Sequence, residues 1–121
     1  MGFLSSLFSG KPKGPEYPLL TDLSVIVTDI HSHLIPGIDD GVKDLDESLA
    51  MIRGFSALGY QKLVTTPHIM SDFYKNTPEI ILGGLARVQE AIQKAGIPIT
   101  IDAAAEYYLD EVLLKKIQTE K

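Results

Sequence analysis

The segment Val25–Gly41, which reads V-I-V-T-D-I-H-S-H-L-I-P-G-I-D-D-G, constrains this chain more than any other stretch. Its first six residues, Val25–Ile30, are mostly β-branched and lack the polar alternation of a half-exposed strand, so they predict a buried strand. Two histidines follow, separated by one residue. Because strand side chains alternate between faces, His31 and His33 point to the same side if the extended path continues.

A loop with proline and glycine follows the histidines and holds two adjacent aspartates. Two imidazoles on one side of a strand, followed by a carboxylate loop, can converge on a cation, so the segment predicts a metal site. Asp40 is the preferred ligand, whereas Asp39 is at least as well explained as a residue that caps the turn or the next helix. Asp29, two residues before His31, either orients an imidazole or is an ordinary polar strand end.

Composition excludes several classes of function. The chain has 121 residues, of which 45% are hydrophobic and 22% are charged, as expected for one globular domain. A formal net charge of −5 argues against nucleic acid or an anionic membrane as the main partner. The absence of cysteine excludes disulfides, thiolate nucleophiles and zinc–sulfur sites. It also fits a reducing compartment, and we expect a cytoplasmic protein.

The N-terminal segment contains several prolines and glycines. We expect a flexible tail over residues 1–22 and a domain over residues 23–121. The start of the chain matches the short myristoylation pattern M-G-x-x-x-[ST], which is common by chance. An amphipathic turn that contacts a membrane or a partner is the weaker alternative. No stretch is long enough to cross a bilayer, and a secretory signal is not expected because the basic residues follow the apolar ones.

Strands and helices alternate after the first strand, with capping residues and glycines at the expected boundaries. The expected elements are a helix from Asp44 to Gly59, a strand over Lys62–Thr66, a helix from Thr77 to Gly96, a strand over Ile99–Ala103 and a helix over Asp110–Ile117. The buried side of the second helix is expected to consist of Leu82, Leu85, Ala86, Val88, Ala91 and Ile92. Three strand–loop–helix units in a row predict an α/β fold with a parallel sheet and helices outside it.

Candidate ligands recur at the same point of each unit, where a strand gives way to its loop. These residues are His31, His68 and Glu106, and the ends of parallel strands form the face on which α/β barrels build active sites. Taken alone, His68 after T-T-P is more often an ordinary loop or core histidine. Glu106 follows an apolar strand, so its burial without a partner is costly and a metal ion would remove that cost.

Three strings together identify a family resemblance: D-I-H-S-H-L-I-P-G-I-D-D-G, T-T-P-H and A-A-E-Y-Y-L-D-E. They resemble the polymerase-and-histidinol-phosphatase (PHP) superfamily, and within it the bacterial tyrosine-protein phosphatases of capsule and exopolysaccharide loci. The similarity runs from about Val25 to Lys116. The H-x-H pair alone is weak, because amidohydrolases also begin with it, whereas the longer string and its spacing to the other two are specific.

The resemblance implies a distorted β/α barrel, similar to a TIM barrel, that binds up to three divalent ions, usually manganese. On the family pattern, His31 and His33 hold one metal, Glu106 bridges it to a second, and Asp40 with His68 holds a third. Imidazole and carboxylate donors suit manganese, iron, cobalt or zinc. Close metals clamp phosphate oxygens, lower the pKa of a bound water and stabilise the leaving phenolate, so no protein nucleophile is required.

The implied substrate is phosphotyrosine, on the tail of a membrane-associated bacterial tyrosine kinase that controls polysaccharide export. A complete β/α barrel needs about 250 residues, so we expect this chain to be the N-terminal half of one. Such a half exposes an apolar sheet edge that can pair with another chain. Two alternatives remain: another PHP phosphoesterase, such as a histidinol-phosphatase, or a catalytically inactive fragment.

Overall fold

The computed structural model describes residues 22–120. Almost all of the expected flexible tail, together with the myristoylation pattern, lies outside these residues. Within them, no helix is long and apolar enough to cross a membrane.

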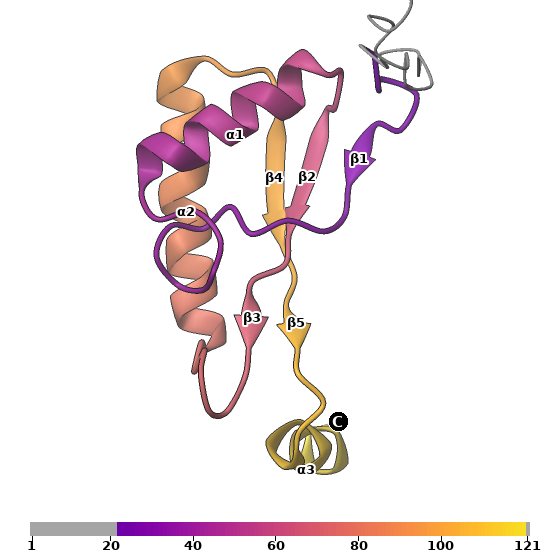
Figure 1. Cartoon of the computed structure of the whole chain (residues 1–121), viewed down its shortest axis with the longest axis vertical. Coiled ribbons are helices and arrows are strands. Elements are labelled where there is room, and N and C mark those ends of the chain that lie inside the picture. The colour runs from indigo at the N-terminus through magenta and orange to yellow at the C-terminus, as the bar shows by residue number, and fades with distance from the viewer. Residues whose placement is uncertain (1–21, 121) are drawn as a thin grey trace, which may run out of the picture.

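Two β-sheets, each made of parallel strands, form the framework of the fold (Figure 1). The central sheet has the order β1-β2-β4 and consists of β1 (Thr28–Asp29), β2 (Lys62–Thr65) and β4 (Thr100–Ala103). The smaller sheet pairs β3 (His68–Ile69) with β5 (Glu106–Tyr107). The predicted α/β class with parallel strands is therefore confirmed. The small sheet was not predicted, because each of its strands is only two residues long and is visible only through its partner.

The first predicted strand is mostly wrong. Among the six residues expected to be buried and extended, only Thr28 and Asp29 form a strand, and Val25 is 89% exposed. A turn precedes β1: the N–H of Ile26 donates to the carbonyl of Leu23 at 2.9 Å, and Val27 has a left-handed φ of 63°. Among the described residues, β1 also pairs on one side only, with β2. Its apolar neighbours are exposed because none of residues 22–120 packs a layer over them.

Helix α1 (Leu45–Ala57) begins and ends where the sequence predicts. The Asp44 carboxylate accepts a hydrogen bond from the Glu47 N–H at 2.8 Å, and the Glu47 carboxylate accepts from the Lys43 N–H at 2.7 Å. Together these bonds satisfy free N–H groups at the start of the helix. Gly59, just after the last turn, has a positive φ of 99°.

Helix α2 (Pro78–Ala95) also has the predicted ends, with Thr77 as N-cap and Gly96 in the left-handed conformation. Its buried face, however, is rotated from the predicted one. Leu82 is 59% exposed and Ala86 is exposed as well, whereas the buried positions are Ile81, Gly84, Leu85, Val88 and Ile92. Leu85, Val88 and Ile92 are thus buried as predicted. Packing against β4 and α1 buries Ile81 and Gly84 in place of Leu82 and Ala86.

The hydrophobic core lies where α1 and α2 cover one face of the central sheet (Figure 1). It contains Leu34, Ile35, Val42, Ile52, Leu63, Ile81, Leu85, Val88, Ile92, Ile99 and Ile101. The other face carries the ion pair between Lys62 and Asp102 at 2.7 Å, whose side chains are 44% and 59% exposed. The sheet is therefore apolar toward the helices and carries at least this charged pair on the opposite side.

Helix α3 (Glu111–Thr119) lies beyond the end of the small sheet (Figure 1). It matches the expected last helix within two residues. Its N-cap, Asp110, accepts hydrogen bonds from the N–H groups of Leu113 at 2.8 Å and of Ser71 at 3.2 Å. The second of these bonds ties the start of α3 to the segment that follows β3.

Candidate metal centre

Hydrogen bonds to the end of β2 hold the H-x-H segment in place. The carbonyl of Ser32 accepts from the Thr66 N–H at 2.6 Å and from the Thr65 hydroxyl at 2.8 Å. The Thr65 hydroxyl oxygen also accepts from the Leu34 N–H at 2.9 Å. Thr65 is fully buried, so this side chain attaches the segment after β1 to the sheet without a regular strand ladder.

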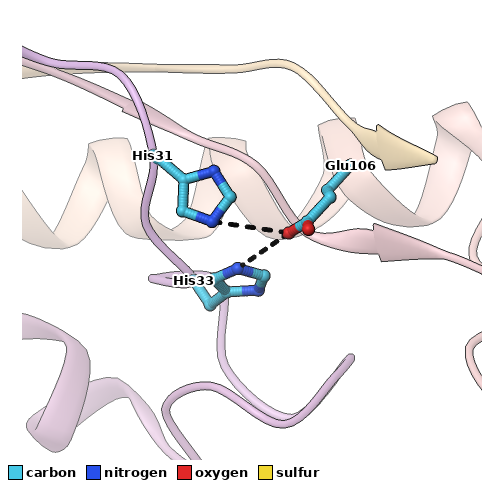
Figure 2. Close-up of side chains that lie close together, drawn as sticks. All are labelled: His31, His33 and Glu106. Atoms are coloured by element: carbon cyan, nitrogen blue, oxygen red, sulfur yellow. Dashed lines mark ion pairs between the residues drawn. The ribbon is translucent and has the colours of Figure 1, made fainter. Parts of the chain in front are cut away.

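A single carboxylate oxygen lies among the three histidines. Oε2 of Glu106 is 3.5 Å from Nε2 of His31, 3.3 Å from Nε2 of His33 and 3.5 Å from Nδ1 of His68. Figure 2 shows the carboxylate of Glu106 reaching the imidazoles of His31 and His33, which point the same way from one segment. The structure thus brings together three segments that are distant in the sequence and that follow the carboxyl ends of β1, β2 and β4. His68 and Glu106 are themselves the first residues of β3 and β5.

Asp40 lies on another side of the same cluster. Its Oδ1 is 3.2 Å from Nε2 of His68 and 4.0 Å from Nδ1 of His33. Two groups of side chains therefore have ligand atoms within 4.8 Å of one another and could each hold a metal ion. One group is His31, His33 and Glu106, the other is His33, Asp40 and His68, and His33 belongs to both.

The donor set fits a divalent cation. Oε2 of Glu106 is buried and has no hydrogen-bond partner among residues 22–120. Its three imidazole neighbours at 3.3–3.5 Å lie beyond the usual hydrogen-bond distance. A buried carboxylate oxygen without a partner is costly, and a cation among these atoms would satisfy it. Imidazole with carboxylate is the donor chemistry of manganese, iron, cobalt and zinc sites.

The two adjacent aspartates have different surroundings. The Asp39 side chain is 1% exposed, whereas that of Asp40 is 62% exposed. Oδ1 of Asp39 accepts from the Gly41 N–H at 3.0 Å, which agrees with the predicted turn. Its Oδ2, in addition, lies 2.8 Å from Nδ1 of His33 and accepts from the His68 N–H at 3.1 Å. Burial raises the pKa of Asp39, but the hydrogen bonds from His33, Gly41 and His68 outweigh it and hold the pKa below its usual value.

Gly41 allows the aspartate turn to lie against the H-x-H segment. A Cβ atom at this position would collide with Cβ and the carbonyl oxygen of His33, so only glycine fits without a shift of the backbone. The Val42 N–H donates to the same carbonyl at 3.2 Å and fixes the approach. The close approach to His33 therefore explains why the D-D-G string ends in glycine.

Three further residues support the histidines and were not singled out in the sequence. Nδ2 of Asn76 donates to the carbonyls of Ile38 at 2.9 Å and His68 at 2.8 Å. The ring of Tyr74 stacks on His68 with a centroid distance of 5.5 Å and an interplanar angle of 14°. The Thr66 hydroxyl lies 3.4 Å from Nδ1 of His31. Asn76 directly precedes a helix cap and Tyr74 lies in a loop, so no local pattern marks them.

Asp29 does not orient an imidazole. Its Oδ2 is buried without a hydrogen-bond partner in the described part of the chain, and the groups near the ring of His31 are Thr66 and Glu106. Of the two explanations offered by the sequence, the orienting role finds no contact in the described residues, and the buried oxygen does not fit an ordinary polar strand end either.

The chain is similar to known proteins over most of its length. Residues 27–121 match the family model described as "Capsular polysaccharide synthesis, CpsB/CapC". The tyrosine-protein phosphatase YwqE of Bacillus subtilis is 32% identical over 73 residues, which are 60% of this chain and 29% of that protein. The tyrosine-protein phosphatase CpsB of Streptococcus agalactiae is 30% identical over 90 residues, which are 74% of this chain and 37% of that protein.

A solved structure shows the same fold over most of the chain. It is described as YwqE from Bacillus subtilis and CpsB from Streptococcus pneumoniae, "unique metal-dependent tyrosine phosphatases". The TM-score is 0.69 and the identity 26%, over 75% of this chain and 37% of that one. The chain thus spans about a third of the length of these relatives. Because the family model covers every strand and helix described above, the chain belongs to the CpsB/CapC family of capsular polysaccharide synthesis.

Proposed function

We propose that this chain provides the first metal-binding part of a phosphatase that hydrolyses phosphotyrosine in proteins. The observation that carries the proposal is Oε2 of Glu106, a buried carboxylate oxygen that faces three imidazoles and has no hydrogen-bond partner among residues 22–120. Membership of a family whose relatives are named tyrosine-protein phosphatases supports the reaction, and a structural relative described as metal-dependent supports the metal.

The proposed ligands are His31, His33, Asp40, His68 and Glu106. Manganese is the metal that we propose, and the donors also suit iron, cobalt or zinc. Divalent ions at such a site supply positive charge for phosphate oxygens and make a water molecule nucleophilic near neutral pH. The protein would act by placing imidazole and carboxylate donors. A thiolate nucleophile is not available, because the sequence contains no cysteine.

We infer that residues 23–121 form part of a distorted β/α barrel, preceded by a tail over residues 1–22. Parallel strands in the order β1-β2-β4, with α1 and α2 on one face, support this inference. The clustering of candidate ligands at the carboxyl ends of strands supports it too, since barrel enzymes build their sites there.

The proposed substrate is the phosphotyrosine tail of a bacterial tyrosine kinase in the cytoplasm. Two findings support this substrate. The description of the family refers to capsular polysaccharide synthesis, and the relatives are named tyrosine-protein phosphatases. We further propose that exposed sheet edges allow the chain to pair with another polypeptide, because β1 and β4 each have one neighbour in the central sheet.

The test measures bound metal and activity on the same sample. The purified chain is reconstituted with Mn²⁺, its metal content is determined, and phosphate release is followed with a phosphotyrosyl peptide and with histidinol phosphate. We expect bound Mn²⁺ and a preference for the peptide, with YwqE of Bacillus subtilis as positive control. Preference for histidinol phosphate would instead indicate another phosphoesterase, and bound metal without either activity would indicate that this chain is catalytically inactive alone.

A further inference from the structure

Asp39 touches two of the proposed ligands from the protein interior. Its Oδ2 lies 2.8 Å from Nδ1 of His33 and 3.1 Å from the main-chain nitrogen of His68. Its Oδ1 accepts from the Gly41 N–H at 3.0 Å. The side chain is 1% exposed, and Asp39 is in neither group of candidate ligands. It contacts the site only through other residues.

The directions of these hydrogen bonds follow from the groups involved. Main-chain N–H groups can only donate, so Gly41 and His68 show that both oxygens of the Asp39 carboxylate accept. Nδ1 of His33 is then the donor toward Oδ2. A neutral imidazole carries one proton, and with that proton on Nδ1 the lone pair is on Nε2. Nε2 is the atom that lies 3.3 Å from Oε2 of Glu106.

We propose that Asp39 is a positioning residue, which keeps the proton of His33 on Nδ1 and so presents the Nε2 lone pair to a metal ion beside Glu106. The inference rests on the proposed function. Metal-bound histidines commonly donate their second N–H to a carboxylate, which fixes the tautomer and the orientation of the ring. Only the unprotonated nitrogen of the ring can be a ligand.

The neighbouring aspartate does not perform this role. Oδ1 of Asp40 is 4.0 Å from Nδ1 of His33, too far for a hydrogen bond, and its side chain is 62% exposed. The adjacent carboxylates are therefore divided between two tasks. Asp39 points inward and orients a ring, whereas Asp40 lies 3.2 Å from Nε2 of His68 and is free to bind a cation.

Asp39 also fixes the second histidine through its backbone. The His68 N–H donates to Asp39, and the His68 carbonyl accepts from Nδ2 of Asn76 at 2.8 Å. Asn76 donates as well to the carbonyl of Ile38, the residue before Asp39. The start of β3 is therefore attached to the aspartate turn at both its N–H and its C=O group. The geometry between His33 and His68 depends on this attachment.

The experiment compares the natural protein with Asp39→Ala. The proton on His33 is located by nitrogen NMR of the metal-free protein, under conditions in which the nitrogen shifts show a ring with a single proton. In the natural protein we expect Nδ1 to carry the proton, and in Asp39→Ala we expect that preference to be lost. Titration with Mn²⁺ should then give a dissociation constant raised by about 10- to 100-fold, as is typical when an outer partner of a metal ligand is removed.

Asp46→Ala is the matched control, because Asp46 is an exposed acid in the first turn of α1. It should leave the proton on His33 and the Mn²⁺ affinity unchanged. The proposal would be overturned if Nδ1 of His33 carried no proton in the natural protein, or if Asp39→Ala bound Mn²⁺ as tightly as the natural protein. The first measurement needs no variant, so it decides even if Asp39→Ala does not fold. It is also independent of phosphatase activity, so failure of the proposed function would be seen separately.

Discussion

At the scale of single residues, the centre is a cluster of imidazole and carboxylate groups that leaves one buried carboxylate oxygen without a hydrogen bond among residues 22–120. Glu106 brings a negative charge to a position where three imidazole nitrogens lie within 3.5 Å. None of these contacts satisfies the buried oxygen by a hydrogen bond. A buried carboxylate oxygen without a hydrogen bond destabilises the folded protein, whereas a bound cation would offset that cost. The role of Glu106 in cation binding can therefore be tested directly.

Glu106→Gln should weaken metal binding strongly while leaving the fold intact. The substitution keeps the size of the side chain but removes the charge that a divalent ion requires. We expect the Mn²⁺ dissociation constant, measured by calorimetry, to rise by at least about 100-fold, the upper range for outer partners of ligands. Glu111→Gln, an exposed acid at the start of α3, is the control and should change nothing. Equal affinity for both variants would contradict the ligand role of Glu106.

Thr65→Val tests what holds the H-x-H segment. Valine has nearly the same shape but lacks the hydroxyl that accepts from the Leu34 N–H, and it leaves that buried donor without a partner. We expect a loss of about 1–3 kcal/mol in the free energy of unfolding, measured with urea. Thr100→Val is the control, since Thr100 is exposed and its hydroxyl bond is long, 3.4 Å. A loss of equal size there would argue against the specific role of Thr65.

At the scale of elements, two turns decide whether the strand ends meet. The aspartate turn approaches the H-x-H segment closely at Gly41, and the start of α3 is attached to the segment after β3 through Asp110. Neither contact involves the hydrophobic core. They can therefore be disturbed separately from the rest of the fold.

Gly41→Ala and Gly54→Ala should have opposite effects. At Gly41 a Cβ atom collides with His33, so we expect a loss of about 1–3 kcal/mol in unfolding free energy, together with weaker Mn²⁺ binding. At Gly54, inside α1, a Cβ atom meets nothing within 4 Å. Alanine there should stabilise by up to about 1 kcal/mol through helix propensity. Urea unfolding of both variants checks the prediction, and a gain at Gly41 would contradict the steric explanation.

Acid should weaken the start of α3 by protonating its N-cap, Asp110. The hydrogen bond from the Leu113 N–H, and a second from Ser71, hold the pKa of Asp110 below its ordinary value. A lowered pKa means that the folded state binds this proton more weakly than the unfolded chain. The stabilisation is therefore complete above the ordinary aspartate pKa and is lost as the pH falls through the lower, folded value.

Amide chemical shifts of residues 111–119, followed from neutral to acid pH, would report this weakening. We expect the shifts to move toward coil values at the acid end in the natural protein. Asp110→Asn cannot ionise, so its α3 shifts should lack this titration. A variant that titrates like the natural protein would show that another group is responsible.

At the scale of the whole molecule, apolar side chains are exposed beside one edge of the central sheet. Val25 is 89% exposed and Ile30 is 73% exposed, both next to β1, the outer strand of the central sheet. The outer edge of β1 has no partner strand among residues 22–120, and exposed apolar residues beside such an edge favour contact with another chain. This property belongs to the arrangement of the sheet and not to any one residue.

We expect concentration-dependent association of the purified chain, measured by light scattering. Ile30→Lys should reduce it, because a charge beside an edge strand opposes pairing. Leu82→Lys is the matched control, since Leu82 is equally apolar and 59% exposed but lies on α2. A monodisperse monomer at all concentrations, or equal effects of both substitutions, would contradict association through the edge at β1.

The sequence by itself determined the features that depend on short-range interactions. Asp44, Thr77 and Asp110 begin the three helices as predicted, because a cap bonds to a group only three residues away. The alternation of strands and helices followed from periodicity, and it placed His68 and Glu106 shortly after the strands that form β2 and β4. It did not show that each of the two residues begins a further short strand. The family also followed from the sequence, since its motif strings are local and specific.

Only the tertiary structure decided what depends on partners far along the chain. The inward role of Asp39 requires His68, and the strand at Glu106 exists only beside β3. The exposure of Val25 and the phase of the buried face of α2 likewise depend on which layers pack where. A hydrophobic pattern indicates which residues can be buried. Whether they are buried depends on a helix or strand that packs over them, and the position of that element is decided by the whole fold.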